Sequence, residues 1–98
     1  MLTRVAVRPA VTRELTALLA EDLGEHREIR GGDQLYDLGM HSLTLARLVA
    51  TLEEVVGVDP FAAEDVSVAD LRSLDDVVAV YERAVARVEP VGAGVSGR

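Results

Sequence analysis

The chain has 98 residues, a formal charge of −7 at pH 7 and no cysteine. Its length suits one small domain, and its acidic balance, with ten arginines and no lysine, excludes a protein that binds nucleic-acid phosphates through clustered cations. The absence of cysteine excludes disulfides and thiolate metal ligands. No segment has the length of a signal peptide or a membrane span, so we expect a single cytoplasmic domain over residues 1–98.

The composition favours helices. Hydrophobic residues make up 49% of the chain and aromatic residues only 3%, so the core must consist of leucine, valine and alanine. We predict an all-α fold: a four-helix bundle with a long loop between helices one and two and a short third helix. The ordered core should span about residues 9–89, and residues 90–98 should form a flexible tail.

The first helix is predicted to begin at Pro9, because proline has a fixed φ and lacks an N–H group that a first helical residue does not need. Residues 1–8 show no helical stripe and should form a loose lead-in. The helix should end near Leu23, with Gly24 as its C-terminal cap. Its apolar face consists of Val11, Leu15, Leu18 and Leu19.

Residues 24–41 form a connection longer than compact domains commonly contain without a function. The charged stretch within it should be solvated, whereas Ile29, Leu35 and Leu38 can tuck into the bundle and hold the end of the loop in place. Gly39 then permits a sharp backbone turn before the next helix.

The second helix is predicted to run from Ser42 to a stop at Gly57, with one apolar stripe facing the core. The inward stripe is Leu45, Leu48, Val49, Leu52 and Val56. At about 100° per residue, the opposite side carries Leu43, Arg47, Ala50 and Glu54. We predict that a partner protein binds this outer face, because the face presents an apolar residue beside a serine at the helix start.

Two later segments, Asp59-Pro60 and 67–70, can each start a single helical turn, and the sequence leaves open whether one or both form the short third helix. Ser73 and Asp76 mark the start of the last helix, which should end before Pro90. Its apolar positions are Leu74, Val77, Val78, Tyr81, Val85 and Val88.

The run Leu38-Gly39-Met40-His41-Ser42-Leu43 resembles the attachment motif of acyl and peptidyl carrier proteins, where Leu-Gly-x-(Asp or His)-Ser-Leu opens the second helix of a four-helix bundle. The similarity continues weakly over most of the chain. It implies a 4'-phosphopantetheine arm on Ser42, which would hold an acyl or aminoacyl group as a thioester while the protein itself catalyses nothing. Carriers of fatty acid synthesis usually have acidic residues where this chain has Thr44 and Arg47. His41 and Arg47 therefore resemble carriers of nonribosomal peptide assembly more closely.

The resemblance also implies partners: a phosphopantetheinyl transferase, an adenylation or acyl-ligase enzyme that loads the arm, and downstream synthase, condensation or tailoring enzymes of nonribosomal peptide or polyketide antibiotic biosynthesis. The candidate partner-facing residues are Met40, His41, Leu43, Arg47 and Glu54. We expect a freestanding monomer, although a domain excised from a multienzyme would look the same. No stretch of the sequence predicts a pocket for an acyl chain.

Two other interpretations compete with this one. His41 and Ser42 could act as base and nucleophile of a hydrolase, but neighbours on a helix point about 100° apart, and no third residue completes a triad. The stronger alternative is an unmodified helical interaction domain, in which Ser42 merely caps the helix and Leu43 docks. Transfer of phosphopantetheine from coenzyme A would separate these hypotheses.

Overall fold

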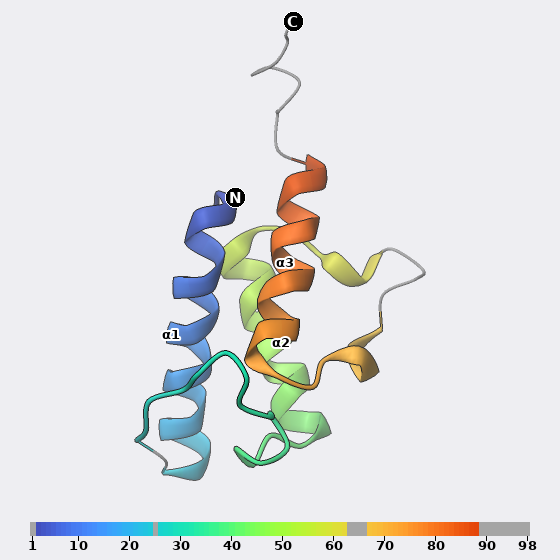
Figure 1. Ribbon diagram of the computed structural model, residues 1–98. Helices are drawn as coiled ribbons and strands as arrows, with labels where there is room; N and C mark the ends of the chain where they lie inside the picture. The colour runs from blue at the N-terminus through green and yellow to red at the C-terminus, as the bar shows by residue number, and fades with distance from the viewer. Residues whose placement is uncertain (1, 25, 63–66, 89–98) are drawn as a thin grey trace, which may run out of the picture.

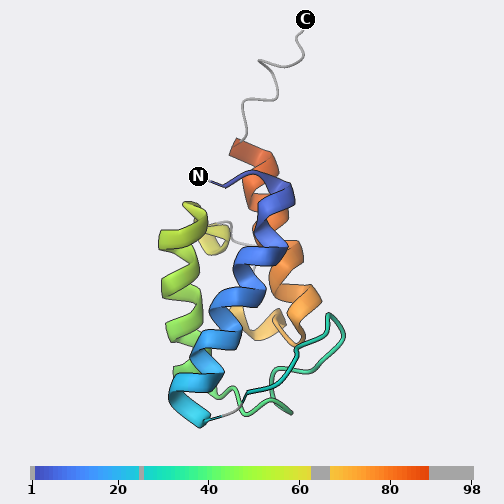
Figure 2. The same cartoon turned by 90° about the vertical axis from the view of Figure 1, so that its left-hand side faces the viewer.

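The computed structural model describes residues 2–24, 26–62 and 67–88, which form three α-helices and two 3-10 turns and contain no β-strand (Figure 1). The helices are α1 (Arg4–Leu23), α2 (Ser42–Val56) and α3 (Leu74–Val88), and the turns are η1 (Pro60–Ala62) and η2 (Val68–Asp70). α1 packs against both other helices and runs antiparallel to them (Figure 2). The end of α1 and the starts of α2 and α3 therefore lie at the same end of the molecule. The predicted all-α class is confirmed.

The segment expected to supply a short third helix forms two separate turns in the described residues. Asp59 Oδ1 accepts the N–H of Phe61 at 3.0 Å at the start of η1. Ser67 Oγ accepts the N–H of Ala69 at 3.1 Å at the start of η2. Both candidate starts are thus used, and the helix expected as the fourth is α3. Residues 63–66 and the expected tail at 90–98 lie outside the described residues.

The start of α1 corrects the sequence prediction, because the helix begins at Arg4 and contains Pro9 in its interior. The lead-in was expected to be loose, but the side chain of Val7 is completely buried. In addition, the N–H of Leu2 donates to the carbonyl oxygen of Val56 at 2.9 Å. This burial and this bond fasten the first turns and offset the N–H group that Pro9 removes from the helix.

The core is built from the apolar faces that the helical spacing predicted. Side chains less than 2% exposed are Val7, Val11, Leu15, Leu19, Leu48, Leu52, Val56, Leu74, Val77, Val78, Tyr81 and Val85. Leu18 and Leu45 are only partly buried, and Val88, expected to face inward, is exposed. The hydroxyl of Tyr81 donates to the carbonyl oxygen of Val49 at 3.3 Å, which ties α3 to α2. Burial in the core raises the pKa of Tyr81 well above its usual range.

The long loop between α1 and α2 is fastened to the segment that enters α3. The N–H of Leu35 donates to Arg72 O and the N–H of Asp75 to Gly31 O, each at 2.8 Å. Asp75 lies in the first turn of α3, so the loop satisfies a backbone donor that the helix cannot pair itself. The side chains of Ile29, Leu35 and Leu38 are buried, as predicted.

Ser73 and Asp76, which the sequence indicated as the start of the last helix, cap the start of α3 reciprocally. Ser73 Oγ accepts the N–H of Asp76 at 3.2 Å, and Asp76 Oδ2 accepts the N–H of Ser73 at 3.1 Å. The carboxylate also accepts the N–H of Arg72 at 2.9 Å. These bonds fix the point where the loop, η2 and α3 meet, which is the end of the molecule where α2 also begins.

Candidate functional site

The turn before α2 is held by backbone hydrogen bonds around a glycine. The N–H of Gly39 donates to Tyr36 O, and the N–H of Met40 donates to Leu35 O, each at 3.0 Å. Gly39 has a φ of +91°, which side chains other than glycine rarely adopt. The predicted sharp turn is therefore confirmed. The side chains of Leu35 and Leu38 are buried in the core and anchor the turn to it.

Replacing Gly39 by alanine should destabilise the fold by about 1–3 kcal/mol, because the left-handed backbone is strained for alanine. The added Cβ would also lie 2.8 Å from Leu23 Cδ1 and push that side chain aside. The matched control is Gly32→Ala, where no heavy atom lies within 4 Å of the new Cβ and φ is not in the left-handed region. Urea denaturation measures both changes, and an equal loss in the two variants would contradict this assignment of strain to Gly39.

Ser42 is the first helical residue of α2, and His41 occupies the N-cap position with extended backbone angles, φ −97° and ψ 177°. The Ser42 side chain is exposed. Its hydroxyl makes no hydrogen bond within the described part of the chain, in contrast to Ser67 and Ser73, which both cap turns or helices. The interpretation in which Ser42 merely caps α2 therefore loses its structural basis.

The start of α2 is suited to a negative charge. The His41 side chain makes no capping hydrogen bond, and the first turn contains no acidic residue. N–H groups at a helix start that no side chain caps, together with the positive end of the helix dipole, favour an anion at this position. A phosphodiester on the exposed Ser42 hydroxyl fits this environment.

The outer face of α2 follows the prediction for Leu43, which is 76% exposed, and for Ala50 and Glu54, which are also exposed. His41 is exposed beside Ser42. Arg47 is exposed as well, but its guanidinium forms an ion pair with the Asp22 carboxylate at the end of α1.

Two candidate residues differ from what the sequence suggested. Met40 is only 5% exposed and belongs to the core, because the bonded turn directs its side chain inward. It is therefore not part of an exposed docking face. Arg47 is not a free cation on the outer face of α2, since the Asp22 carboxylate neutralises much of its local charge.

An open cavity of about 520 Å³ lies directly beside Ser42. We call it the Ser42 cavity, and it is lined by Tyr36, Met40, His41, Ser42, Leu45, Ala69 and Leu71. Three segments form it: the turn before α2, the first turns of α2, and η2 with the residue that follows. Sequence reasoning missed Ala69 and Leu71 because they lie far along the chain from Ser42. It missed Tyr36, although an aromatic residue between two buried leucines of a loop was a usable signal.

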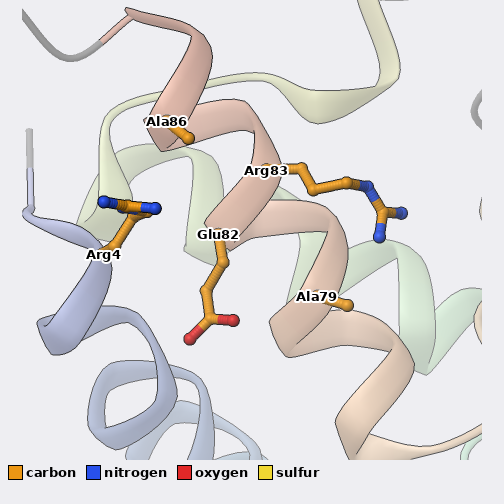
Figure 3. A pocket seen from close by; sticks show the side chains of 5 residues that line it. All are labelled: Arg4, Ala79, Glu82, Arg83 and Ala86. Atoms are coloured by element: carbon orange, nitrogen blue, oxygen red, sulfur yellow. The ribbon is translucent and has the colours of Figure 1, made fainter. Parts of the chain in front are cut away.

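A smaller cavity of about 280 Å³ lies between the first turn of α1 and α3 (Figure 3). Its lining is Arg4, Ala79, Glu82, Arg83 and Ala86. In Figure 3, Glu82 extends toward α1, whereas Arg83 points to the other side of α3. This cavity is at the opposite end of the bundle from Ser42 and offers no nucleophile, so it does not belong to the candidate site (Figure 1).

The described residues contain neither a cluster of metal-ligating side chains nor a helix that could span a membrane. No group of three or more histidine, aspartate or glutamate side chains among them could hold a metal ion. None of the helices they form combines the length and the apolar character needed to cross a membrane.

The described residues thus form a small helical domain in which the Ser42 hydroxyl is exposed and unbonded at the start of α2. Residues 13–80 match the protein family described as the phosphopantetheine attachment site. The match covers more than half of the chain, which therefore belongs to this family of carrier domains. Members of the family carry a 4'-phosphopantetheine group and are not catalytic themselves; they bring the arm to partner enzymes. No curated protein and no solved structure gave a significant match to the chain.

Proposed function

We propose that Ser42 is the attachment residue and that the protein carries acyl or aminoacyl groups as thioesters on its 4'-phosphopantetheine arm. The observation that carries this proposal is the Ser42 hydroxyl, which is exposed at the first position of α2 and bonded to nothing in the described part of the chain. The chain has no cysteine, so the thiol must come from the arm. Uncapped N–H groups at the helix start stabilise the negative charge of the phosphodiester.

The direct test is incubation with a phosphopantetheinyl transferase and coenzyme A, followed by intact mass. In the reaction, Ser42 Oγ attacks the phosphorus next to pantetheine, an Oγ–P bond forms, and the pyrophosphate bond of coenzyme A breaks. Adenosine 3',5'-bisphosphate leaves, and the hydroxyl proton passes to a base of the transferase. The protein should gain the mass of one phosphopantetheinyl group, and peptide mapping should find it on Ser42. An unchanged mass would favour the alternative, an unmodified helical interaction domain.

We further propose that its partners belong to nonribosomal peptide or polyketide biosynthesis rather than to fatty acid synthesis. Loading would then depend on an adenylation or acyl-ligase enzyme, and delivery on condensation, synthase or tailoring enzymes. What supports this proposal is the outer face of α2, where Thr44 and Arg47 replace the acidic residues usual in fatty acid carriers. Leu43, 76% exposed, provides an apolar contact beside the arm.

Arg47→Glu tests the partner class, because enzymes that bind fatty acid carriers tend to present basic patches. The variant should serve a fatty-acid ketosynthase faster than the parent and an adenylation or acyl-ligase partner more slowly. The rate changes should shrink at high salt, since interface charges act mainly on association. The ion pair with Asp22 adds a small folding cost, about 0.2–1 kcal/mol for an exposed pair.

Asp22→Asn is the matched control for this experiment. It removes the neutralising carboxylate and leaves Arg47 in place, so the fatty-acid ketosynthase should use this variant even less well than the parent. Partner preference that is identical in the parent and both variants at low salt would contradict the proposal.

Three further expectations remain predictions. The region between α2 and α3 is proposed to complete the four-helix bundle usual in acyl and peptidyl carriers, through η1 and η2. The protein is proposed to act as a monomer in the cytoplasm. Size-exclusion chromatography coupled to light scattering measures directly whether the protein is a monomer.

A further inference from the structure

We infer that Leu23, in the last turn of α1, is a positioning residue for the transfer of phosphopantetheine to Ser42. This inference rests on the proposed attachment of the arm to Ser42 and adds a residue from another helix to that reaction. The Ser42 hydroxyl is exposed and makes no hydrogen bond in the described part of the chain, so its place depends on the backbone that carries it. The groups that hold this backbone therefore decide where the hydroxyl meets coenzyme A.

Leu23 packs on the turn before α2. A Cβ added to Gly39 would lie 2.8 Å from Leu23 Cδ1, 3.9 Å from its Cγ and 4.0 Å from its Cδ2, so the branched end of Leu23 lies against the glycine. Leu23 is 38% exposed and lies outside the buried core, so this contact is separate from the packing of the core. The N–H of Met40 also ties the turn to the buried Leu35, whose carbonyl oxygen it reaches at 3.0 Å. The turn is therefore held both by the core and by the end of α1.

The last turn of α1 contacts the chain on both sides of Ser42. Before the serine, Leu23 lies against Gly39. After the serine, Asp22 forms its ion pair with Arg47 of α2, which keeps the end of α1 beside that helix. α1 ends at the same end of the molecule where α2 begins (Figure 2). Two adjacent side chains of α1 thus bracket the residue that takes the arm.

The transfer depends on this placement, because Ser42 Oγ must approach the phosphorus of coenzyme A in line with the bond that breaks. A misplacement of about 1 Å can slow such a step by about a hundredfold. Without the Leu23 side chain, the turn at Gly39 loses its contact with α1, and the first turn of α2 gains freedom. Fewer of the carriers bound to the transferase then hold the hydroxyl in the reactive position, which lowers kcat and leaves binding almost unchanged.

Leu23→Ala should lower kcat for the transfer by about tenfold and change the KM for the carrier by less than about twofold. Amide hydrogen exchange of Gly39 and Met40 should be faster in the same variant, because the bonds that their N–H groups make within the turn open more often. Leu23→Met should restore both properties, because a flexible apolar side chain still reaches the glycine. Leu23→Val should have a smaller effect in the same direction, which keeps the test decisive if the alanine variant folds poorly.

The matched control is Val88→Ala. It removes another exposed apolar side chain from the last turn of a helix, at the opposite end of the bundle from Ser42 (Figure 1). This variant should change neither kcat nor the exchange of the two amides. A loss of kcat as large as in Leu23→Ala would overturn the inference, because the effect would then follow from a general loosening of the fold.

A double variant tests the contact itself. Leu23→Ala removes the side chain that a Cβ at position 39 would meet, so Gly39→Ala should be less damaging in that background. The stability loss of the double variant, measured by urea denaturation, should be smaller than the sum of the two single losses. Additive losses would show that the two residues do not touch in solution and would overturn the inference.

The outcomes separate this inference from the proposed function. A parent protein that gains no phosphopantetheinyl mass, or gains it on a residue other than Ser42, would overturn both. Loading of Ser42 with an unchanged kcat in Leu23→Ala would overturn the inference alone. A raised KM with an unchanged kcat would also overturn it, because Leu23 would then bind the transferase directly.

Discussion

Ser42→Ala should abolish transfer of phosphopantetheine and leave the fold intact. The alanine lacks the oxygen that attacks coenzyme A, so intact mass should show no gain under conditions that convert the parent completely. The free energy of unfolding should change by no more than about 0.5 kcal/mol, because the Ser42 hydroxyl is exposed and bonded to nothing in the described residues. Urea denaturation followed by circular dichroism measures this second effect.

The matched control is Ser73→Ala, which removes another serine hydroxyl, this time from the start of α3. Ser73 is buried and its Oγ accepts the N–H of Asp76 at 3.2 Å, so its loss should cost about 0.5–2 kcal/mol. Loading on Ser42 should continue. The two variants therefore have opposite expected phenotypes, one in modification and one in stability. A Ser42→Ala protein that folds and still gains the full mass would show that another residue holds the arm.

Leu48→Ala should produce the largest loss of stability among the substitutions considered, about 2–5 kcal/mol. The Leu48 side chain is 1% exposed on the inward stripe of α2, so truncation removes buried surface and leaves a cavity in the core. Leu43→Ala, on the outer face of the same helix, should cost about 1 kcal/mol or less, because Leu43 is 76% exposed. It should instead slow the transferase or later partners.

Leu48→Met is the control, because it changes the shape of the side chain but nearly conserves its buried volume. It should cost less than about 1.5 kcal/mol. Thermal and urea unfolding measure stability for all three variants, and transferase rates are measured on the same samples. Equal stability losses for Leu43→Ala and Leu48→Ala would mean that α2 is rotated about its axis relative to this structure.

Much of the fold follows from local pattern. The inward stripes of α2 and α3 were predictable because a helix places every third and fourth residue on one face, and burial then selects that face. The Ser73–Asp76 cap and the turns at Asp59 and Ser67 depend on bonds between residues close in sequence, and the sequence therefore revealed them.

The start of α1 shows where local pattern failed. Pro9 indicated a helix start, but the burial of Val7 and the bond from Leu2 to Val56 extend the helix upstream of it. That bond joins residues far apart in the chain, so no window around Pro9 could contain it. Val7 does continue the stripe of α1 by one step, and this was the signal available in the sequence.

For the site, the sequence by itself predicted that Ser42 begins α2 and which residues face outward on that helix, because both depend on a short motif and on helical geometry. Only the tertiary structure decided what surrounds that serine. The cavity joins the loop, α2 and η2, Arg47 is paired with Asp22 of α1, and Met40 turns into the core. Each of these outcomes depends on how the antiparallel α1 and the fastened loop pack against α2 and α3. Distances across separate segments are set by packing of the whole core, and residue spacing along the chain does not encode them.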